Sequence, residues 1–242
     1  ALIVIGGIGF MTWDDIKTNG LKWKRYRMQS KVILTTTALL ILIPAAYFFF
    51  FEFSDAPLNE RIWSSFFQSV TPRTAGFNTV DLTTISETGC MIMIALMLIG
   101  GSPGSTAGGM KTTTFAVMLS NAVSVFRRRE HTHFFGRRIS SDTLRNAATI
   151  FTMYVTLCLV GGCAISYMEN LPLVTCLYET ASAVGTVGLT LGITPELGLP
   201  SQYILIFLMY VGRVGGLTLI FAALTGGRDV SVRLPQEKLT VG

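Results

Sequence analysis

Charged side chains are scarce in this sequence. Asp, Glu, Lys and Arg together account for 14% of the 242 residues, whereas apolar residues account for 50%. Soluble domains carry about twice that share of charge. The composition therefore argues against a soluble enzyme with a single anchor and favours a membrane protein that crosses the bilayer several times.

The sequence also lacks paired cysteines and a catalytic set. Its four cysteines, Cys90, Cys158, Cys163 and Cys176, have no Cys-x-x-Cys spacing and lie in or beside apolar segments. We expect them to be small buried hydrophobic residues rather than disulfides or metal ligands. No Ser/His/Asp set or carboxylate pair falls at membrane depth, so the sequence predicts no enzyme and no covalently bound cofactor.

An initiator methionine and a signal peptide are missing as well. The chain opens on ALIVIGGIGFM, inside an apolar run with neither a basic start nor a small-residue cleavage site. We therefore expect the chain to begin inside an earlier membrane helix. Residues 1–13 would be the end of the last helix of a preceding repeat.

Four apolar blocks reach about the 20 residues that a bilayer-spanning helix needs. They are Val32–Phe53, Cys90–Phe126, Asn146–Met168 and Gln202–Leu224. Two shorter apolar stretches, Ile62–Val70 and Leu173–Val184, fall between them and are too short to span. The sequence thus predicts an all-α membrane protein built from repeated units of helix, pore helix with filter loop, and helix, as in a potassium-channel-like pore.

Basic residues are concentrated in three polar segments, the loops 14–31 and 127–145 and the tail 227–242. The charged residues of the intervening polar stretches, 52–87 and 169–201, are mostly Asp and Glu. Because Lys and Arg are retained on the cytoplasmic side of membrane proteins, we expect both basic loops and the C-terminal tail to be cytoplasmic. The same rule accounts for the net charge of +5 without a nucleic-acid partner.

Two parts of the chain, 32–126 and 146–226, align without a gap, with Thr74 over Thr186 at an offset of 112 residues. Each part has a Gly- and Thr-rich filter segment after its short helix. The two filter segments are Thr74, Ala75, Gly76, Phe77 and Asn78, and Thr186, Val187, Gly188, Leu189 and Thr190. Both repeats insert in the same direction, which favours an axis along the membrane normal over an inverted repeat.

The filter segments suit the coordination of a monovalent cation. Gly76 and Gly188 allow backbone angles that other residues avoid, so successive carbonyl oxygens can point to one axis and replace the water shell of an ion. Each preceding short helix would direct its negative C-terminal end towards the ion. The alternative is that these segments are only Gly/Thr turns between helices.

The second block, Cys90–Phe126, is interrupted at its centre by a segment that cannot be a continuous helix. It consists of Gly100, Gly101, Ser102, Pro103, Gly104, Ser105, Thr106, Ala107, Gly108, Gly109, Met110 and Lys111. Irregular backbone at membrane depth is tolerated where it lines a cavity. We expect a loop on the cytoplasmic side of the filter, where a gate would be useful.

Two cations accompany this loop within the apolar blocks, where an ionic side chain is costly. Arg213 aligns with Gly101 at the offset of 112 residues, so it should lie at the level of the loop. We expect Arg213 to donate to loop carbonyls, either as part of a gate or as a purely structural clamp. Lys111 would repel a cation or cap the broken helix end.

Five motifs in order resemble the Trk/Ktr family of potassium-uptake membrane subunits: TPRTAGFNTVDL, GGSPGSTAGGMKTTTF, ASAVGTVGLTLGITPELG, GRVGGLTL and LPQEKLTVG. The glycine-terminated tail is more similar to the Ktr branch. The resemblance covers essentially the whole chain and implies four pore repeats, of which this chain holds the end of the second, the third and the fourth. It also implies that Ala75–Asn78 and Val187–Thr190 line the filter and that Gly100–Lys111 is a gating loop with Arg213 as its partner.

The resemblance further implies potassium uptake across the cell membrane by a homodimer with one pore per chain. Cytoplasmic nucleotide-binding regulatory subunits would dock on the basic face, and K⁺ held by filter carbonyls would be the substrate. Two alternatives stay open from the residues themselves. One is sodium or mixed monovalent-cation conduction, and the other is a non-conducting membrane scaffold subunit.

Overall fold

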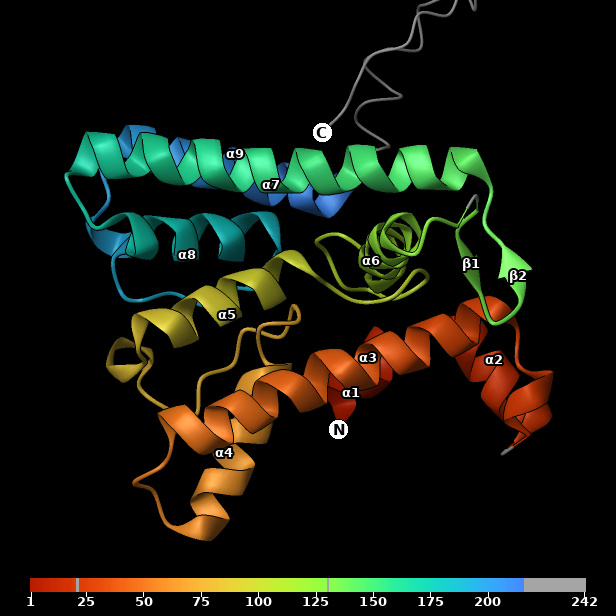
Figure 1. The fold of residues 1–242 in the computed structure, drawn as a ribbon. Helices are drawn as coiled ribbons and strands as arrows, with labels where there is room; N and C mark the ends of the chain where they lie inside the picture. Colours follow the sequence, from red (N-terminus) through yellow and green to blue (C-terminus); the bar gives the residue numbers. More distant parts are fainter. Residues whose placement is uncertain (21, 130, 216–242) are drawn as a thin grey trace, which may run out of the picture.

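The structure is a computed structural model that describes residues 1–20, 22–129 and 131–215 (Figure 1). These residues are mostly helical, as the sequence predicts. The helices are α1 (Leu2–Gly7), α2 (Phe10–Asn19), α3 (Met28–Tyr47), α4 (Leu58–Val70), α5 (Glu87–Leu98), α6 (Thr112–Phe126), α7 (Ser141–Glu169), α8 (Leu173–Val184) and α9 (Leu199–Val214). Short 3₁₀ turns lie at Trp23–Arg25, Leu82–Thr84 and Thr194–Glu196, and a π-helical turn, Phe48–Glu52, extends α3.

The two repeats form two units with the same order of helices, one containing α3, α4 and α5 and the other α7, α8 and α9. The two units lie on top of each other (Figure 1). In Figure 1 the long helix α7 and helix α9 form the upper layer, with α8 directly beneath them. Helix α5 lies between α8 and α3, and α4 lies lowest. Helix α8 packs against α7 and α9 of its own unit and against α5 of the other unit, so the short helix α8 occupies the centre of the molecule.

The offset of 112 residues recurs in the backbone. The 3₁₀ turns Leu82–Thr84 and Thr194–Glu196 are 112 residues apart, and so are the first residues of α5 and α9, Glu87 and Leu199. Positive φ angles occur at Thr74 and Gly76 and again at their counterparts in the second filter segment. The two filter segments therefore share one backbone course.

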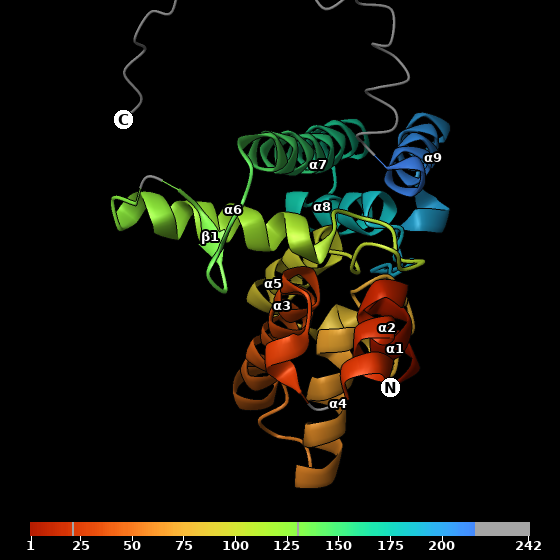
Figure 2. The same cartoon turned by 90° about the vertical axis from the view of Figure 1, so that its right-hand side faces the viewer.

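The predicted spanning block Cys90–Phe126 is two helices that run in different directions. Figure 1 shows α6 end-on and α7 side-on, whereas Figure 2 shows α6 side-on. Helix α6 therefore crosses α7 instead of continuing in the direction of α5. The interruption by glycine and proline was predicted, but the change of direction that it permits was not.

Several helix bounds differ from the predicted ones. Helix α2 runs past residue 13 to Asn19, and α7 begins at Ser141, inside the predicted basic loop 127–145. Helix α9 ends at Val214 because Gly215, with φ of +85°, leaves the helical region. The predicted block Gln202–Leu224 is thus not one helix up to its end, and residues 216–224 and the tail 227–242 lie outside the described residues.

The basic loop between α6 and α7 holds a small hairpin that an all-α prediction omitted. Strands β1 (His133–Phe134) and β2 (Arg137–Arg138) pair antiparallel, with His133 opposite Arg138. The turn uses positive φ angles at Phe135 and Gly136, which is the geometry of a tight two-residue hairpin.

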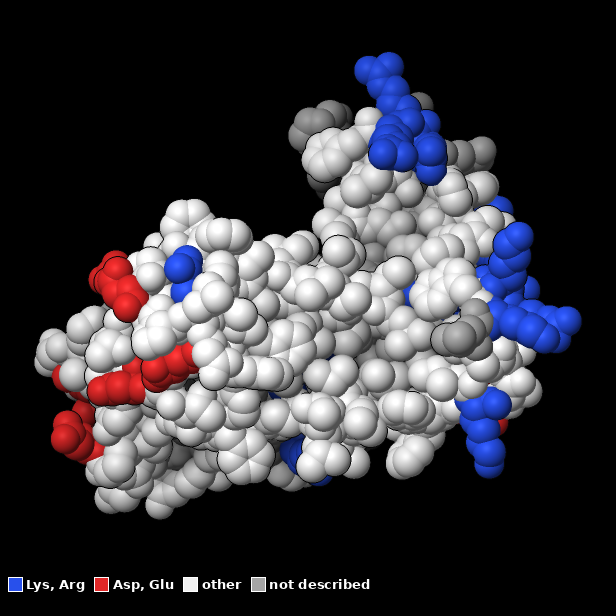
Figure 3. Space-filling view, turned by 90° about the horizontal axis from the view of Figure 1, so that it is seen from below, with Lys and Arg blue, Asp and Glu red and all other residues white. Residues whose placement is uncertain are grey.

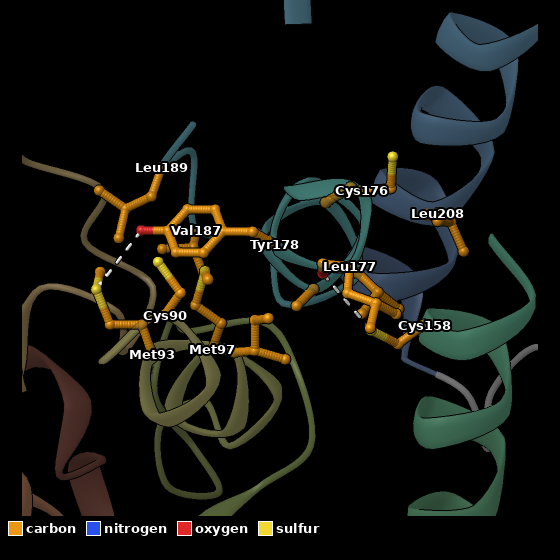
Figure 4. Packing of buried hydrophobic residues seen from close by; sticks show 14 of the residues in the cluster. Cys90, Met93, Met97, Cys158, Cys176, Leu177, Tyr178, Val187, Leu189 and Leu208 are labelled. Carbon is orange, nitrogen blue, oxygen red and sulfur yellow. Dashed lines mark hydrogen bonds between the residues drawn. The ribbon is translucent and has the colours of Figure 1, made fainter. Parts of the chain in front are cut away.

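The buried core lies where α5, α7 and α8 meet (Figure 4). Met93 and Met97 of α5 face Tyr178 of α8, whose hydroxyl lies 3.7 Å from the Met93 sulfur. Cys90, Cys158 and Cys176 are buried and free, as predicted, but Cys163 is exposed on α7. Its position on the outer face of α7 corrects the expectation that all four cysteines are buried.

Two of the described helices are long and apolar enough to cross a membrane, Met28–Glu52 and Ser141–Glu169. Four shorter apolar helices accompany them: α5, α6, α8 and α9. On the face shown in Figure 3, acidic residues gather at one end of the molecule, and most of the visible basic residues lie towards the other. This separation agrees with the alternation of acidic and basic segments in the sequence.

Candidate functional site

The two filter segments meet at the centre of the molecule. A Cβ atom added at Gly76 would overlap the carbonyl oxygen of Val187, so the first segment touches the second through a bare glycine. Nothing lies within contact distance of the corresponding position at Gly188. Gly76 is therefore required for close approach, whereas Gly188, with φ of +92°, is required by its backbone angle.

Both filter segments hold a threonine in a conformation that is unusual for a β-branched residue. Thr74 has φ of +61° and Thr186 has φ of +51°. Such angles strain a β-branched side chain, and strain of this kind gathers at functional sites. The strained threonines occupy equivalent positions, so the backbone of both segments is held by its surroundings and not by local preference.

The first filter segment is held by Thr71, the residue after α4. The Thr71 hydroxyl accepts a hydrogen bond from the amide of Phe77 (3.0 Å) and donates one to the Phe77 carbonyl (2.6 Å). The Thr71 carbonyl also accepts from the amides of Ala75 and Gly76, each at 3.2 Å. Phe77 itself is exposed.

Ser182 and Glu179 of α8 hold the second filter segment. The Ser182 hydroxyl accepts from the amide of Gly188 (3.1 Å), and its carbonyl accepts from the amide of Val187 (2.9 Å). The Glu179 carboxylate binds the hydroxyl of Thr190 at 2.6 Å. Side chains of the short helix therefore determine the course of the filter segment that follows it.

A pocket of about 640 Å³ opens beside the second filter segment. Its lining combines the segment Thr186–Thr190 with Glu179, with Leu205 and Met209 of α9, and with Arg213. The lining thus combines the backbone of the second filter segment with one carboxylate, one guanidinium group and apolar side chains.

The segment between α5 and α6 is irregular, as predicted, but its backbone is well paired. The amide of Gly100 donates to the carbonyl of Met110 (2.9 Å), and the amide of Met110 donates to Leu98 (3.1 Å). The two ends of the loop therefore lie side by side. The Ser102 amide donates to the carbonyl of Gly7 at 2.9 Å, which anchors the loop to α1.

Glycines bring this loop directly against the second filter segment. A Cβ atom at Gly108 would overlap the hydroxyl oxygen of Thr186, and one at Gly100 would overlap the carbonyl oxygen of Gly108. The Thr186 hydroxyl is buried and has no hydrogen-bond partner among the described residues. The loop thus packs beneath the filter segment with no room for further side-chain atoms.

Both Lys111 and Arg213 donate hydrogen bonds to carbonyls of the loop. Arg213 donates from Nη1 to the carbonyl of Thr106 at 2.8 Å, which is the contact predicted for it. Lys111 donates from Nζ to the carbonyl of Ala107 at 2.6 Å. Lys111 therefore fixes the loop itself and does not cap the end of α5, and the gating roles assigned to both residues stay predictions.

Arg73 was not predicted as a site residue, yet it lies between the first filter segment and the loop. It is 8% exposed, and its Nη2 lies 3.4 Å from the carbonyl of Gly100. Its Nε atom has no partner among the described residues and borders a small cavity next to Thr37, whose hydroxyl is also unpaired. The signal in the sequence was a lone arginine inside an otherwise uncharged segment.

Asp81 follows the first filter segment in the chain and caps the 3₁₀ turn Leu82–Thr84. Its carboxylate accepts from the hydroxyl of Thr83 (2.7 Å) and from the Thr83 amide (2.9 Å). These hydrogen bonds hold the pKa of Asp81 below its ordinary value. The group is therefore ionised at neutral pH and contributes to the negative charge of the stretch 52–87.

A mostly helical fold with two helices long and apolar enough to cross a membrane, together with a match to a family model, places the chain in the class of membrane transport proteins. A family model described as cation transport protein TrkH matches residues 19–238, which is most of the sequence. The chain belongs to this TrkH/Ktr family of cation transport proteins.

Curated relatives support the assignment along the whole chain. The chain is 38% identical over 253 residues to the potassium/sodium uptake protein NtpJ of Enterococcus hirae, covering 100% of this chain and 56% of that protein. It is 34% identical over 247 residues to the Ktr system potassium uptake protein B of Bacillus subtilis, covering 100% and 55%. The chain thus spans about half the length of the curated relatives it matches.

A solved structure shows the same fold. The crystal structure of the potassium transporter TrkH from Vibrio parahaemolyticus matches with a TM-score of 0.74 and 20% sequence identity, over 93% of this chain and 50% of that one. At this level of identity the match supports the arrangement of helices and short pore helices.

Proposed function

We propose that this chain supplies two filter segments and the intramembrane gating loop of a channel-like pore for potassium uptake. The observation that carries the proposal is the pair of equivalent filter segments, each with a strained threonine and a glycine at positive φ, in contact at Gly76 and Val187. Backbone carbonyls held in this way replace the water shell of a monovalent cation. Names of relatives that specify potassium uptake support the choice of ion.

The loop Gly100–Lys111 is proposed as the gate because it packs against Thr186 and is hydrogen-bonded to Arg213. Opening would break the Arg213–Thr106 bond and move Gly108 away from the filter segment. A relative named for potassium and sodium uptake keeps sodium or mixed-cation conduction as the second candidate function. A non-conducting scaffold is the alternative from a different class.

The proposed assembly extends beyond these residues. Four filter segments are needed around one axis, so two more would come from repeats that precede the two described here. We propose a homodimer in the cell membrane, with the basic end in the cytoplasm. Nucleotide-binding regulatory subunits would dock on that end, where exposed arginines such as Arg137 and Arg138 lie.

The filter is tested with a protein that carries this chain together with its preceding repeats, in cells that lack potassium uptake. Gly188→Ser places a side chain at φ of +92° in a carbonyl-lined segment, so we expect a weaker preference for potassium over sodium. Gly136→Ser is the matched control, because Gly136 also has positive φ (+78°) and open surroundings but lies in the hairpin turn. Unchanged selectivity of the first variant at normal abundance would remove the filter assignment, and a scaffold would show no ion phenotype in either.

The gate is tested in the same cells with Arg213→Ala. Loss of the hydrogen bond from Arg213 to Thr106 frees the loop, so we expect a higher potassium flux at low external potassium. Arg137→Ala, which removes an exposed arginine of the hairpin, is the control. An equal or lower flux with normal abundance would favour the structural clamp over the gate.

A further inference from the structure

Glu179 is a buried carboxylate in the middle of the short helix α8. Glu179 is only 4% exposed, and its neighbours on α8 include the buried residues Tyr178 and Thr180. Burial of a carboxylate is strongly unfavourable unless it is well hydrogen-bonded or paired with a cation. No ion pair to Glu179 occurs within the part of the chain that the structure describes.

The carboxylate instead accepts three hydrogen bonds from the segment that follows Gly188. One oxygen, Oε1, accepts from the Thr190 hydroxyl (2.6 Å) and from the Leu191 amide (3.0 Å). The other, Oε2, accepts from the Thr194 hydroxyl (2.7 Å). The Thr190 and Thr194 hydroxyls also lie 2.9 Å apart. One carboxylate therefore ties the outer end of the filter segment to the centre of its supporting helix.

The first repeat has different residues at the positions equivalent to Glu179 and Thr194. At the offset of 112 residues, Glu179 corresponds to Phe67 and Thr194 corresponds to Leu82. Leu82 is 4% exposed and belongs to the apolar core. The first repeat therefore has two apolar residues at the positions where the second has a carboxylate that accepts a hydrogen bond and a hydroxyl that donates it.

We propose that Glu179 is the positioning and specificity-determining residue of the second filter segment. Its three hydrogen bonds to Thr190, Leu191 and Thr194 fix the outer end of the filter segment, and its carboxylate, with no cationic partner in the described residues, favours occupancy of the outer filter by a cation. This inference rests on the proposed function of the segment as an ion filter.

Three variants separate charge from geometry in the protein that carries the preceding repeats. Glu179→Gln keeps the shape and removes the charge, and Glu179→Asp keeps the charge but shortens the side chain. Glu196→Gln removes a charge from an exposed residue of the same outer segment and is the control. The measurements are the potassium concentration for half-maximal uptake and the ratio of potassium to sodium uptake.

We expect Glu179→Gln to raise the half-maximal concentration about tenfold, the effect expected from weakening hydrogen bonds to a charged group. Glu179→Asp should lower the potassium to sodium ratio with a smaller change in half-maximal concentration. Glu196→Gln should change neither. Equal values for native protein, Glu179→Gln and Glu196→Gln would overturn the inference while leaving potassium uptake, and so the proposed function, intact.

Two further measurements keep the test decisive. Thr194→Val removes one hydrogen-bond donor but keeps the carboxylate, so it replaces Glu179→Gln in the test if that variant does not fold. We expect Thr194→Val to lower the ratio of potassium to sodium uptake. Hydrogen exchange of the Leu191 amide should be faster in Glu179→Gln than in Glu196→Gln, since that amide donates to Glu179. This measurement does not depend on transport. Absence of potassium uptake by the native protein would overturn the proposed function. Equal exchange rates of the Leu191 amide in Glu179→Gln and Glu196→Gln would overturn the role of Glu179.

Discussion

At the scale of single residues, glycines decide how closely the loop and the filter segments approach. Gly76, Gly100 and Gly108 each face a backbone or hydroxyl oxygen at a distance that leaves no room for a Cβ atom. Two of these contacts join the loop to itself and to Thr186. The absence of side chains at these positions is therefore a packing requirement and not a mark of flexibility.

Gly108→Ala should lower stability. The added methyl group would overlap the Thr186 hydroxyl, and overpacking of this kind costs about 1–3 kcal/mol. We expect a lower midpoint of thermal unfolding for the purified protein in detergent. Gly6→Ala is the control, because nothing lies within contact distance of a Cβ atom at Gly6, and equal midpoints for the two variants would contradict the packing argument.

At the scale of elements, a carboxylate at the end of each long helix holds the start of a later one. Glu52, at the end of the π-helical turn after α3, accepts from the amide and the hydroxyl of Ser86, the residue before α5. Glu169, at the end of α7, accepts from the Gly198 amide (2.9 Å) and the Ser201 hydroxyl (2.5 Å) at the start of α9. A carboxylate at the N-terminus of a helix is also stabilised by the positive end of the helix dipole.

Glu169→Ala should therefore destabilise the junction of α7 and α9. Loss of a capping carboxylate costs about 1–2 kcal/mol, which we expect to measure as a lower midpoint of thermal unfolding. Glu196→Ala, at an exposed residue, is the control. If Glu169→Ala and Glu196→Ala unfold at the same temperature, the cap contributes nothing measurable.

At the scale of the whole molecule, the separation of acidic and basic ends (Figure 3) is the feature that relates the fold to the membrane. Basic residues near helix ends are retained on the cytoplasmic side during insertion. The exposed residues Asp55 and Arg137 belong to the acidic segment before α4 and to the basic hairpin, so they should lie on opposite sides of the membrane.

Cysteine labelling tests this orientation in a background where the four native cysteines are replaced. A cysteine introduced as Asp55→Cys should react with a membrane-impermeant maleimide in intact cells. One introduced as Arg137→Cys should react only after the membrane is permeabilised. The reverse pattern would show that the charge bias does not set the orientation of this protein.

Much of the architecture follows from local patterns in the sequence. The apolar runs placed α3, α7 and the short helices, and the bounds of α8 match the predicted stretch Leu173–Val184. The offset between the repeats located both filter segments, and glycine and proline marked the break between α5 and α6. These features depend on composition and on neighbours along the chain, which is why they were predictable.

The sequence by itself determined that the chain is helical, apolar, repeated and interrupted by loops rich in glycine. Tertiary structure alone decided the direction of α6, the contact of Gly108 with Thr186, and the hydrogen-bond partners of Arg73 and Glu179. Each of these depends on where side chains from distant segments point once the helices have packed. A hydrogen bond between residues far apart in the chain leaves no periodic signal in the sequence, so only the packed molecule shows which oxygen each buried charge meets.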